Sequence, residues 1–269
     1  MRGEHFLSRR RFLQAGLVVG CGLYFPGIAL AAPAMDPAEQ ARRVAEFRSM
    51  CGGIEQCLVP RLGKDAARDA AMDCAARFEE LLPSLPFIGG TANRNQENLI
   101  QAAWLIAMSK AVKAGGLAAA DAGRILYDLC ERELAATPEK DLLTRGAAYF
   151  SPESYASLRA WAEETQKRRY PGDWVATAVF GNGEDFDVGH DYAQCGAVLL
   201  GRAHGEADVI RYFCLNDFLF SRYEGTGLRR VHTLAQGDPL CDFRYKRGRT
   251  VTQSWETEVP RFPASTVKT

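Results

Sequence analysis

The residues of this sequence best suited to chemistry are three cysteines and an aspartate in its last third. Cys214 and Asp217 lie one helical turn apart, with Cys195 before them and Cys241 after them. Side chains at this spacing on a helix are neighbours, so the thiol and the carboxylate can touch. A carboxylate in this position is suited to general acid or base catalysis, or to orienting such a group. The alternative is a buried carboxylate that caps a backbone amide or pairs with an arginine such as Arg230.

The predicted helix over 206–222 gives Asp217 an unusual position. The residues spaced to share one face of this helix are Ile210, Phe213, Cys214, Asp217 and Phe218. A carboxylate on an apolar stripe costs free energy unless it is hydrogen-bonded, paired or protonated. We therefore expect Asp217 to have either a specific partner or a function.

A predicted strand over 241–246 brings the third thiol into the same layer. Side chains alternate between the two faces of a strand, so Cys241 and Phe243 point the same way. If the aromatic side chain faces the helices, Cys241 joins the layer of Cys195 and Cys214.

Three converging thiols are compatible with several arrangements. They can be a nucleophile with its neighbours, a disulfide with one free thiol, or small buried apolar side chains. They can also bind a soft metal ion or an iron–sulfur cluster, with Cys195, Cys214 and Cys241 as ligands. The sequence has no Cys-x-x-Cys pair to strengthen the metal interpretation. The sequence leaves the cofactor unknown, since a site of thiols and a carboxylate requires none.

Two histidines lie close to these residues in the sequence. His190 and Asp191 come just before the predicted helix that follows Cys195. A histidine beside a cysteine can raise its thiolate fraction, with a carboxylate orienting the ring. The alternative is that His190 and Asp191 only end a strand and cap the helix. His232 shares a strand face with Arg230, so we expect that it can line the site.

Asp242 and Arg244 point to the opposite face of the last strand from Cys241. Pairing between them, or cross-strand pairing with Arg229, is the structural interpretation. If that face lines a cleft, the planar fork of Arg244 can bind a substrate carboxylate.

The pattern of apolar residues and turn residues predicts an α+β fold. The region 36–170 is predicted to be helical, beginning at Asp36-Pro37, with further helices at about 64–82, 95–115, 120–136 and 151–168. Strands are predicted at 174–180, 186–191, 228–234 and 241–246, with helices at 192–203 and 206–222 between the second and third. This β-β-α-α-β-β order implies a small antiparallel sheet with helices on one face. The helical half then packs on it as a lid or forms a separate module.

The first residues are typical of a twin-arginine export signal. Ser8 to Gln14 read Ser-Arg-Arg-Arg-Phe-Leu-Gln, followed by a short apolar stretch that glycines interrupt. We expect cleavage after 1–31 and a periplasmic mature protein that meets the membrane only transiently, through the export machinery. The alternatives are a retained membrane anchor and a lipoprotein attached at Cys21.

Charge and cysteine content follow from this prediction. Without 1–31 the chain has 29 basic and 32 acidic residues, a formal charge of −3. Such a balance gives no electrostatic basis for binding nucleic acid. Seven cysteines remain, an odd number, so they cannot all pair within one chain in an oxidising compartment.

Three short motifs in the last third resemble the L-2-amino-thiazoline-4-carboxylic acid hydrolase family. They are Cys214-Leu215-Asn216-Asp217, the stretch from Arg230 to Gly237 with Thr233-Leu234 inside it, and Cys241-Asp242-Phe243-Arg244. They occur in the order of a Cys-x-x-Asp helix, an Arg-x-x-Thr-Leu-x-x-Gly strand and a closing strand. The resemblance covers about 173–247, under a third of the chain, and leaves 248–269 as a C-terminal tail.

The resemblance implies an exported hydrolase of a carbon–nitrogen bond in a small cyclic amidine or amide. The implied catalytic residues are Cys214, Asp217, Cys195, Cys241, Asp242 and His190. The implied contacts to a small-molecule substrate come from Arg230, Thr233, Arg244 and His232. The alternative function is an accessory or maturation protein whose clustered cysteines bind a metal or an iron–sulfur cluster. A module braced by disulfides, with no site of its own, is the third interpretation.

Overall fold

The computed structural model describes residues 35–262. The export signal predicted over 1–31 and the end of the tail lie outside these residues. Within 35–262, no helix combines the length and the apolar character needed to cross a membrane.

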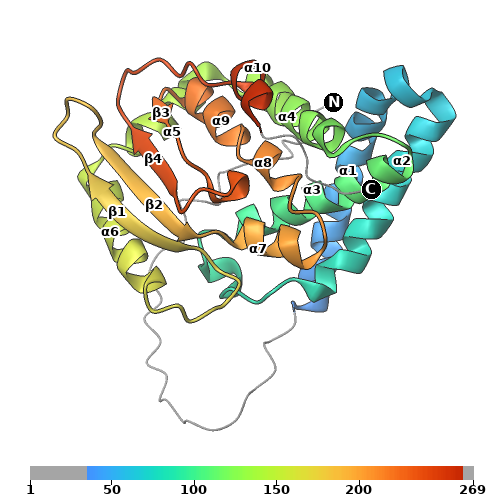
Figure 1. Cartoon of the computed structure of the whole chain (residues 1–269), viewed down its shortest axis with the longest axis horizontal. Coiled ribbons are helices and arrows are strands. Elements are labelled where there is room, and N and C mark those ends of the chain that lie inside the picture. Colours follow the sequence, from blue (N-terminus) through green and yellow to red (C-terminus); the bar gives the residue numbers. More distant parts are fainter. Residues whose placement is uncertain (1–34, 263–269) are drawn as a thin grey trace, which may run out of the picture.

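Helices make up most of the first part of the described chain (Figure 1). They are α1 (Pro37–Leu62), α2 (Lys64–Leu81), α3 (Gln96–Ala114), α4 (Ala119–Ala136), α5 (Glu139–Ala148) and α6 (Pro152–Thr165), with short 3₁₀ turns η2 (Leu82–Ser84) and η3 (Gly90–Ala92). The central one is α3, which is apolar on nearly all sides and buries Trp104 and Ile106. A helix that is apolar all round belongs in a core.

The second part of the described chain forms the sheet and four short α-helices. The strands are β1 (Val175–Phe180), β2 (Val188–Gln194), β3 (Leu228–Arg229) and β4 (Cys241–Tyr245). They pair antiparallel in the order β1-β2-β4-β3. Between β2 and β3 lie α7 (Gly196–Ala203), α8 (Ile210–Phe213) and α9 (Asn216–Glu224), and η4 (Leu234–Gln236), α10 (Trp255–Glu258) and η5 (Val259–Arg261) complete the chain.

One face of the sheet is apolar and carries the helices. His190 pairs with Phe243 and Tyr192 with Cys241, so these four side chains share a face. Trp161 of α6 and Phe218 of α9 lie over this face. Trp161 contacts the His190 ring, and Phe218 stacks on the Arg230 guanidinium, which in turn stacks on Phe243. The predicted α+β fold, with helices on one face of a small antiparallel sheet, is confirmed.

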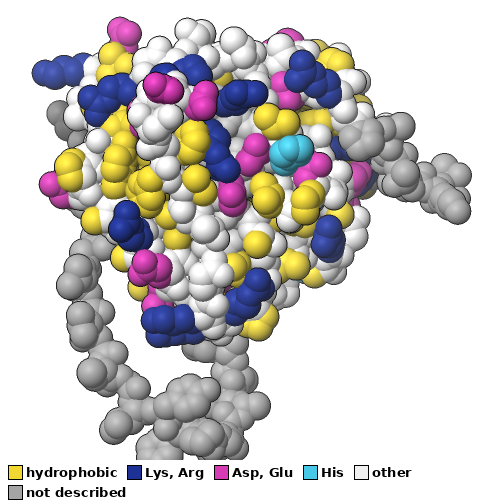
Figure 2. Space-filling model, turned by 60° about the vertical axis from the view of Figure 1, so that its left-hand side comes forward, with side chains coloured by type: hydrophobic (Ala, Val, Ile, Leu, Met, Phe, Trp, Pro, Cys, Tyr) yellow, Lys and Arg dark blue, Asp and Glu magenta, His cyan; other side chains and the backbone are white. Residues whose placement is uncertain are grey.

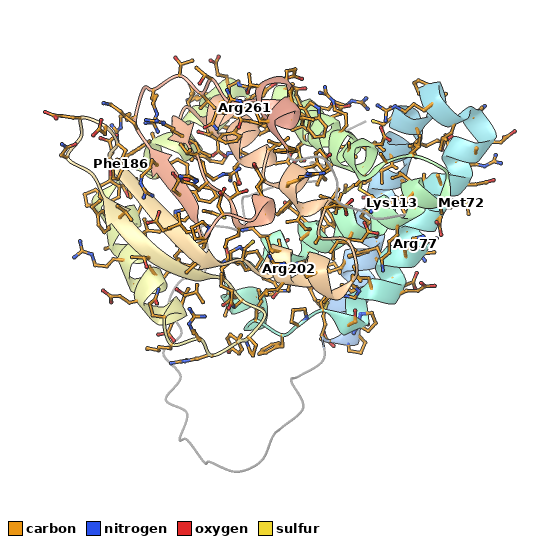
Figure 3. All side chains as sticks on the ribbon, viewed as in Figure 1. Met72, Arg77, Lys113, Phe186, Arg202 and Arg261 are labelled. Atoms are coloured by element: carbon orange, nitrogen blue, oxygen red, sulfur yellow. The ribbon has the colours of Figure 1, made fainter. Side chains whose placement is uncertain are left out.

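The helical part and the sheet part share one hydrophobic core. A single cluster of buried side chains includes residues from α1 to α4, from α7 to α9 and from β4. Figure 1 shows the sheet on one side of the molecule and the α1–α2 pair on the other, with α3 and α4 between them. In Figure 3, Phe186 in the β1–β2 turn and Met72 on α2 mark these two ends. The helical part is therefore packed against the sheet part rather than separated from it by a linker.

The outer face of the sheet is polar. Arg244 and Asp191 pair across β4 and β2 there, at 2.7 Å. In Figure 2, where the side with the sheet is turned forward, basic and acidic side chains are interspersed among apolar ones.

The prediction of one continuous helix over 206–222 is wrong. The chain forms two short helices, α8 and α9, with Cys214 and Leu215 in the turn between them. At this turn the Cys214 carbonyl accepts a hydrogen bond from Nη2 of Arg230, at 2.8 Å. A long-range partner therefore competes with helix continuation at the residue that the pattern placed mid-helix.

The predicted strand over 228–234 is much shorter in the structure, because a side chain binds the backbone N–H groups that would extend it. Oδ1 of Asp242 accepts from the backbone N–H groups of Val231 and His232, at 2.9 and 2.5 Å. These donors are then lost to a regular ladder, and β3 ends at Arg229. The i, i+2 ion pair expected between Asp242 and Arg244 does not form.

Two other elements differ from the sequence pattern. Strand β2 runs from Val188 to Gln194, so His190 and Asp191 lie within it rather than at its end. The pattern also missed α5, a short helix with few apolar residues. Its signals are Pro138 before the first turn and acidic residues within that turn.

The contact between α5 and α9 depends on a glycine. A Cβ at Gly146 would overlap the backbone carbonyl of Glu224, whereas a Cβ at Gly52 on α1 would meet no heavy atom within 4 Å. We expect Gly146→Ala to lower the free energy of unfolding by about 1–3 kcal/mol, because overpacking forces the two helices apart. We expect Gly52→Ala to raise it by about 0.5–1 kcal/mol, because alanine is the better helix former. Urea unfolding of the two variants checks this, and equal effects would show that the α5–α9 approach is not tight.

Candidate active site

A cavity of about 190 Å³ lies between the sheet and the helices. This is several times the roughly 30 Å³ that a water molecule occupies in the liquid, so a small molecule fits. The residues that line it come from both parts of the chain. Among them are Arg94, Trp161, Trp174, His190, Tyr192, Cys195, Cys214, Asn216, Asp217, Arg230, Cys241 and Phe243.

The three thiols predicted to share a layer all line this cavity. Cys195 comes from the start of α7, Cys214 from the turn before α9 and Cys241 from the start of β4. All three are free thiols in the described structure. The convergence expected from strand alternation and helix spacing is therefore present.

Burial keeps these thiols protonated. It raises the pKa of Cys195, Cys214 and Cys241 to about 12 each, and a neighbouring thiol contributes to the rise at each of them. The N–H groups of Ala197 and Val198 and the Trp174 indole act in the opposite direction at Cys195 but do not offset burial. Near neutral pH the sulfur atoms are therefore neutral S–H groups rather than nucleophilic thiolates.

Arg230 connects two of the predicted site residues, Asp217 and Cys214. Its side chain is buried, and Nη1 donates to Oδ2 of Asp217 at 2.7 Å while Nη2 donates to the Cys214 carbonyl at 2.8 Å. Its guanidinium lies between the rings of Phe218 and Phe243, 4.8 and 4.7 Å from their centres. The pairing of Asp217 with Arg230 that the sequence allowed is thus present, and the Asp217 carboxylate also lines the cavity.

His190 is part of an aromatic wall. Its ring stacks on Phe243 at 4.6 Å and meets Tyr192 edge-on at 4.7 Å. Nδ1 is buried and has no hydrogen-bond partner within residues 35–262. Burial, together with the positive charges of Arg94, Arg244 and Arg230, lowers the pKa of His190 to about 3. The ring is therefore neutral and packed, which leaves it without the positive charge that would favour a thiolate at Cys195.

Four predicted site residues do not line the cavity. Asp242 caps the amides after β3, and Arg244 pairs with Asp191 on the outer face. The exposed His232 lies 3.6 Å from Asp238 through Nδ1, and Thr233 is buried with its backbone N–H bound to the same aspartate. Strand alternation explains this separation for Asp242 and Arg244, since Cys241 and Phe243 occupy the cavity face.

Several cavity residues were not predicted from the sequence. Tyr192 lies between two predicted residues, and burial raises the pKa of its phenol well above the ordinary value, so it is a neutral donor. Asn216 is 5% exposed, and its Oδ1 has no partner within residues 35–262. Arg94 and Trp161 come from the helical part, outside the motifs. The signal for Arg94 was the polar run Thr91 to Asn98, which leads into the apolar central helix α3.

Across residues 35–262, no three His, Cys, Asp or Glu side chains are arranged to hold a metal ion.

The raised pKa of the cavity thiols has a direct chemical consequence. At about pH 7, a thiol with a pKa near 12 has roughly a thousandfold less thiolate than one near 9. We expect Cys195, Cys214 and Cys241 to resist iodoacetamide in the folded protein and to react readily after unfolding in urea. Peptide mass spectrometry measures each site, with the half-buried Cys57 as an internal comparison. Rapid labelling of Cys195 or Cys214 at neutral pH in the folded protein would contradict a protonated cavity.

The lowered pKa of His190 predicts a loss of stability in mild acid. The unfolded chain binds a proton near pH 6.5 and the folded chain only near pH 3, so the contribution is complete above pH 6.5 and is lost as pH falls. We expect His190→Phe, which keeps the stack on Phe243, to remove a slope of about 1.4 kcal/mol per pH unit in that window. Urea unfolding at several pH values measures it. Identical pH slopes in the wild type and in His190→Phe would show that His190 has the same pKa in the folded and unfolded chains.

Comparisons with known proteins give no further guidance on this site. No family model, no curated protein and no solved structure matches the chain. The cavity and its side chains are therefore the basis for a functional assignment.

Proposed function

We propose that this protein is a hydrolase that opens a carbon–nitrogen bond in a small cyclic amidine or amide, and that the cavity is its active site. The observation that carries the proposal is the position of Asp217. Its side chain is 32% exposed, lines the cavity and is fixed by a buried arginine. The export signal predicted over 1–31 extends the proposal, since it implies that the substrate is met outside the cytoplasm.

The geometry of Asp217 is suited to a general base. Arg230 binds its Oδ2, which fixes the carboxylate and leaves Oδ1 outside this ion pair. A carboxylate oxygen beside a small cavity can accept a proton from a water molecule that attacks a bound substrate. Holding the base on a rigid partner keeps water, base and substrate in line.

The resemblance noted in the sequence supports the reaction class. Cys214, Asp217, Arg230 and Cys241 belong to its three motifs, and all four line one cavity. The motif residues that lie elsewhere have structural partners instead, as Asp242 does with the amides after β3. The resemblance and the cavity therefore agree on these four residues.

The proposed reaction adds one water molecule. The water oxygen bonds to the amidine carbon while Asp217 takes one of the water protons, and the π electron pair of the carbon–nitrogen double bond moves to the nitrogen. The carbon–nitrogen bond then breaks, and its electron pair goes to the nitrogen. That nitrogen takes the proton from Asp217 and the second proton from the hydroxyl of the intermediate. The carbon keeps the oxygen as a carbonyl, and Asp217 returns to a carboxylate.

Neutral donors around the cavity suit such an intermediate. The Tyr192 phenol and the three thiols are protonated, since burial raises the pKa of each. Donors placed where negative charge develops stabilise a transition state more than a ground state. Water is therefore the proposed nucleophile, and the thiols serve as uncharged walls and weak donors.

Turnover in isotopically labelled water tests this mechanism. We expect the full-length chain to open 2-amino-thiazoline-4-carboxylate or a related cyclic amidine and to incorporate the water oxygen into the product. We expect Asp217→Asn to lower kcat by about 10²- to 10⁴-fold, because the amide cannot take a proton. The asparagine oxygen can still accept from Arg230, and urea unfolding of the variant checks that the fold is retained.

Two further variants separate the alternatives. Asp69→Asn, at an exposed aspartate on α2, is the matched control and should keep wild-type kcat. Cys214→Ser should retain turnover, because the thiol is not the nucleophile. Loss of turnover in Cys214→Ser, together with a trapped covalent intermediate, would replace water by the thiol. Full activity of Asp217→Asn would eliminate the proposed base.

A further inference from the structure

Arg94 brings a positive charge to the cavity from the helical part of the chain. It lies just before α3, and its guanidinium carbon is 4.5 Å from the ring centre of Trp161 on α6. Both residues line the cavity. Stacking on a tryptophan face holds a guanidinium in place and leaves its edge free to bind. Arg94 is thus positioned without being neutralised by that contact.

The fork of Arg94 has no acidic partner in the described chain. Its Nη1 is buried and makes no hydrogen bond within residues 35–262. Within the same residues, no carboxylate forms an ion pair with Arg94, in contrast to the pairs made by Arg230 and Arg244. A buried donor without an acceptor costs free energy, so this atom is suited to an acceptor that a ligand supplies.

Two other arginines, Arg230 and Arg145, line the cavity. Arg230 uses Nη1 for Asp217 and Nη2 for the Cys214 carbonyl, with aromatic rings on both faces. Arg145 donates through Nε to the Asp141 carbonyl of its own helix, at 3.4 Å. Arg230 or Arg244 was expected from the sequence to bind a substrate carboxylate, but the fork of Arg230 is occupied and Arg244 pairs with Asp191 on the outer face. Nη1 of Arg94 is instead a buried donor without a partner within residues 35–262.

A series of contacts between aromatic rings links Arg94 to the proposed reaction centre. Trp161 contacts both His190 and Tyr192, at 6.2 and 6.0 Å between ring centres, and Tyr192 contacts Phe243. Tyr192 lies within electrostatic reach of Arg94 and of Asp217. A flat ligand over this wall can therefore place an anionic group toward Arg94 and its reacting carbon toward Asp217.

We propose that Arg94, stacked on Trp161, is the anion-binding residue of the cavity and selects small planar ligands that carry a carboxylate. The subsite deepens the proposed function and rests on it, since it assigns the non-reacting end of the substrate. It also gives a reason for the common core of the helical part and the sheet, because each part supplies one half of the site.

Binding of two unreactive probes tests the subsite separately from catalysis. The probes are thiazole-4-carboxylate and thiazole-4-carboxamide, which share shape and lack an amidine to open. For the full-length protein, we expect calorimetry to give at least about tenfold tighter binding of the carboxylate, because a paired charged hydrogen bond forms. We expect Arg94→Met to bring the ratio near one while the carboxamide affinity stays within about threefold. Arg94→Lys should keep part of the preference.

Two control variants show whether the preference belongs to Arg94 or to another cation. Arg48→Met removes an exposed arginine of α1 and should leave the ratio unchanged. A preference that persists in Arg94→Met, or that disappears in Arg145→Met instead, overturns the proposal. Failure of the wild-type protein to prefer the carboxylate overturns it as well.

The binding measurement and the turnover measurement, taken together, keep the subsite and the proposed reaction separable. A carboxylate preference that depends on Arg94, without hydrolysis of any cyclic amidine, would sustain the subsite and remove the proposed reaction. Hydrolysis that depends on Asp217, with a preference that Arg94→Met does not change, would do the reverse.

Discussion

The buried guanidinium of Arg230 is the interaction on which the rest of this structure depends. It binds the Asp217 carboxylate and the Cys214 carbonyl, and it lies between an aromatic ring of α9 and one of β4. Asp217 matches the charge of this deeply buried arginine, as burial requires, although its Nε has no hydrogen-bond partner within residues 35–262. Through these contacts a single side chain fixes the break between α8 and α9, the orientation of an acid and the distance from helix to sheet.

As a result, the two parts of the cavity wall differ in charge. Around Arg230 the charges are paired and the thiols are neutral, so that part of the wall is polar without net charge. Arg94 adds an unpaired positive charge from the helical part. Cavities that bind small molecules commonly combine apolar and aromatic walls with a few placed polar groups. The arrangement here follows that pattern, with residues drawn from the start of α3 to β4.

Local patterns in the sequence predicted much of the fold and part of the site. The alternation of Cys241 and Phe243 placed the thiol on the correct face, and the helix spacing brought Asp217 next to Cys214, although the helix itself is interrupted there. What the pattern could not supply were long-range partners. The break at Cys214 depends on Arg230, and the short β3 depends on Asp242, residues that are distant or on another strand. Arg94 and Trp161 were missed for the same reason, since nothing local relates α3 and α6 to β2.

The neutral thiols of the cavity also bear on how the protein responds to its surroundings. Disulfide exchange and oxidation both proceed through the thiolate, so a sulfur that stays protonated is a slow partner in either process. Cys195, Cys214 and Cys241 line one cavity with their pKa values raised to about 12 by burial. Their proximity alone would favour cross-linking, whereas their protonation opposes it. In the folded chain, protonation therefore slows cross-linking among these three thiols.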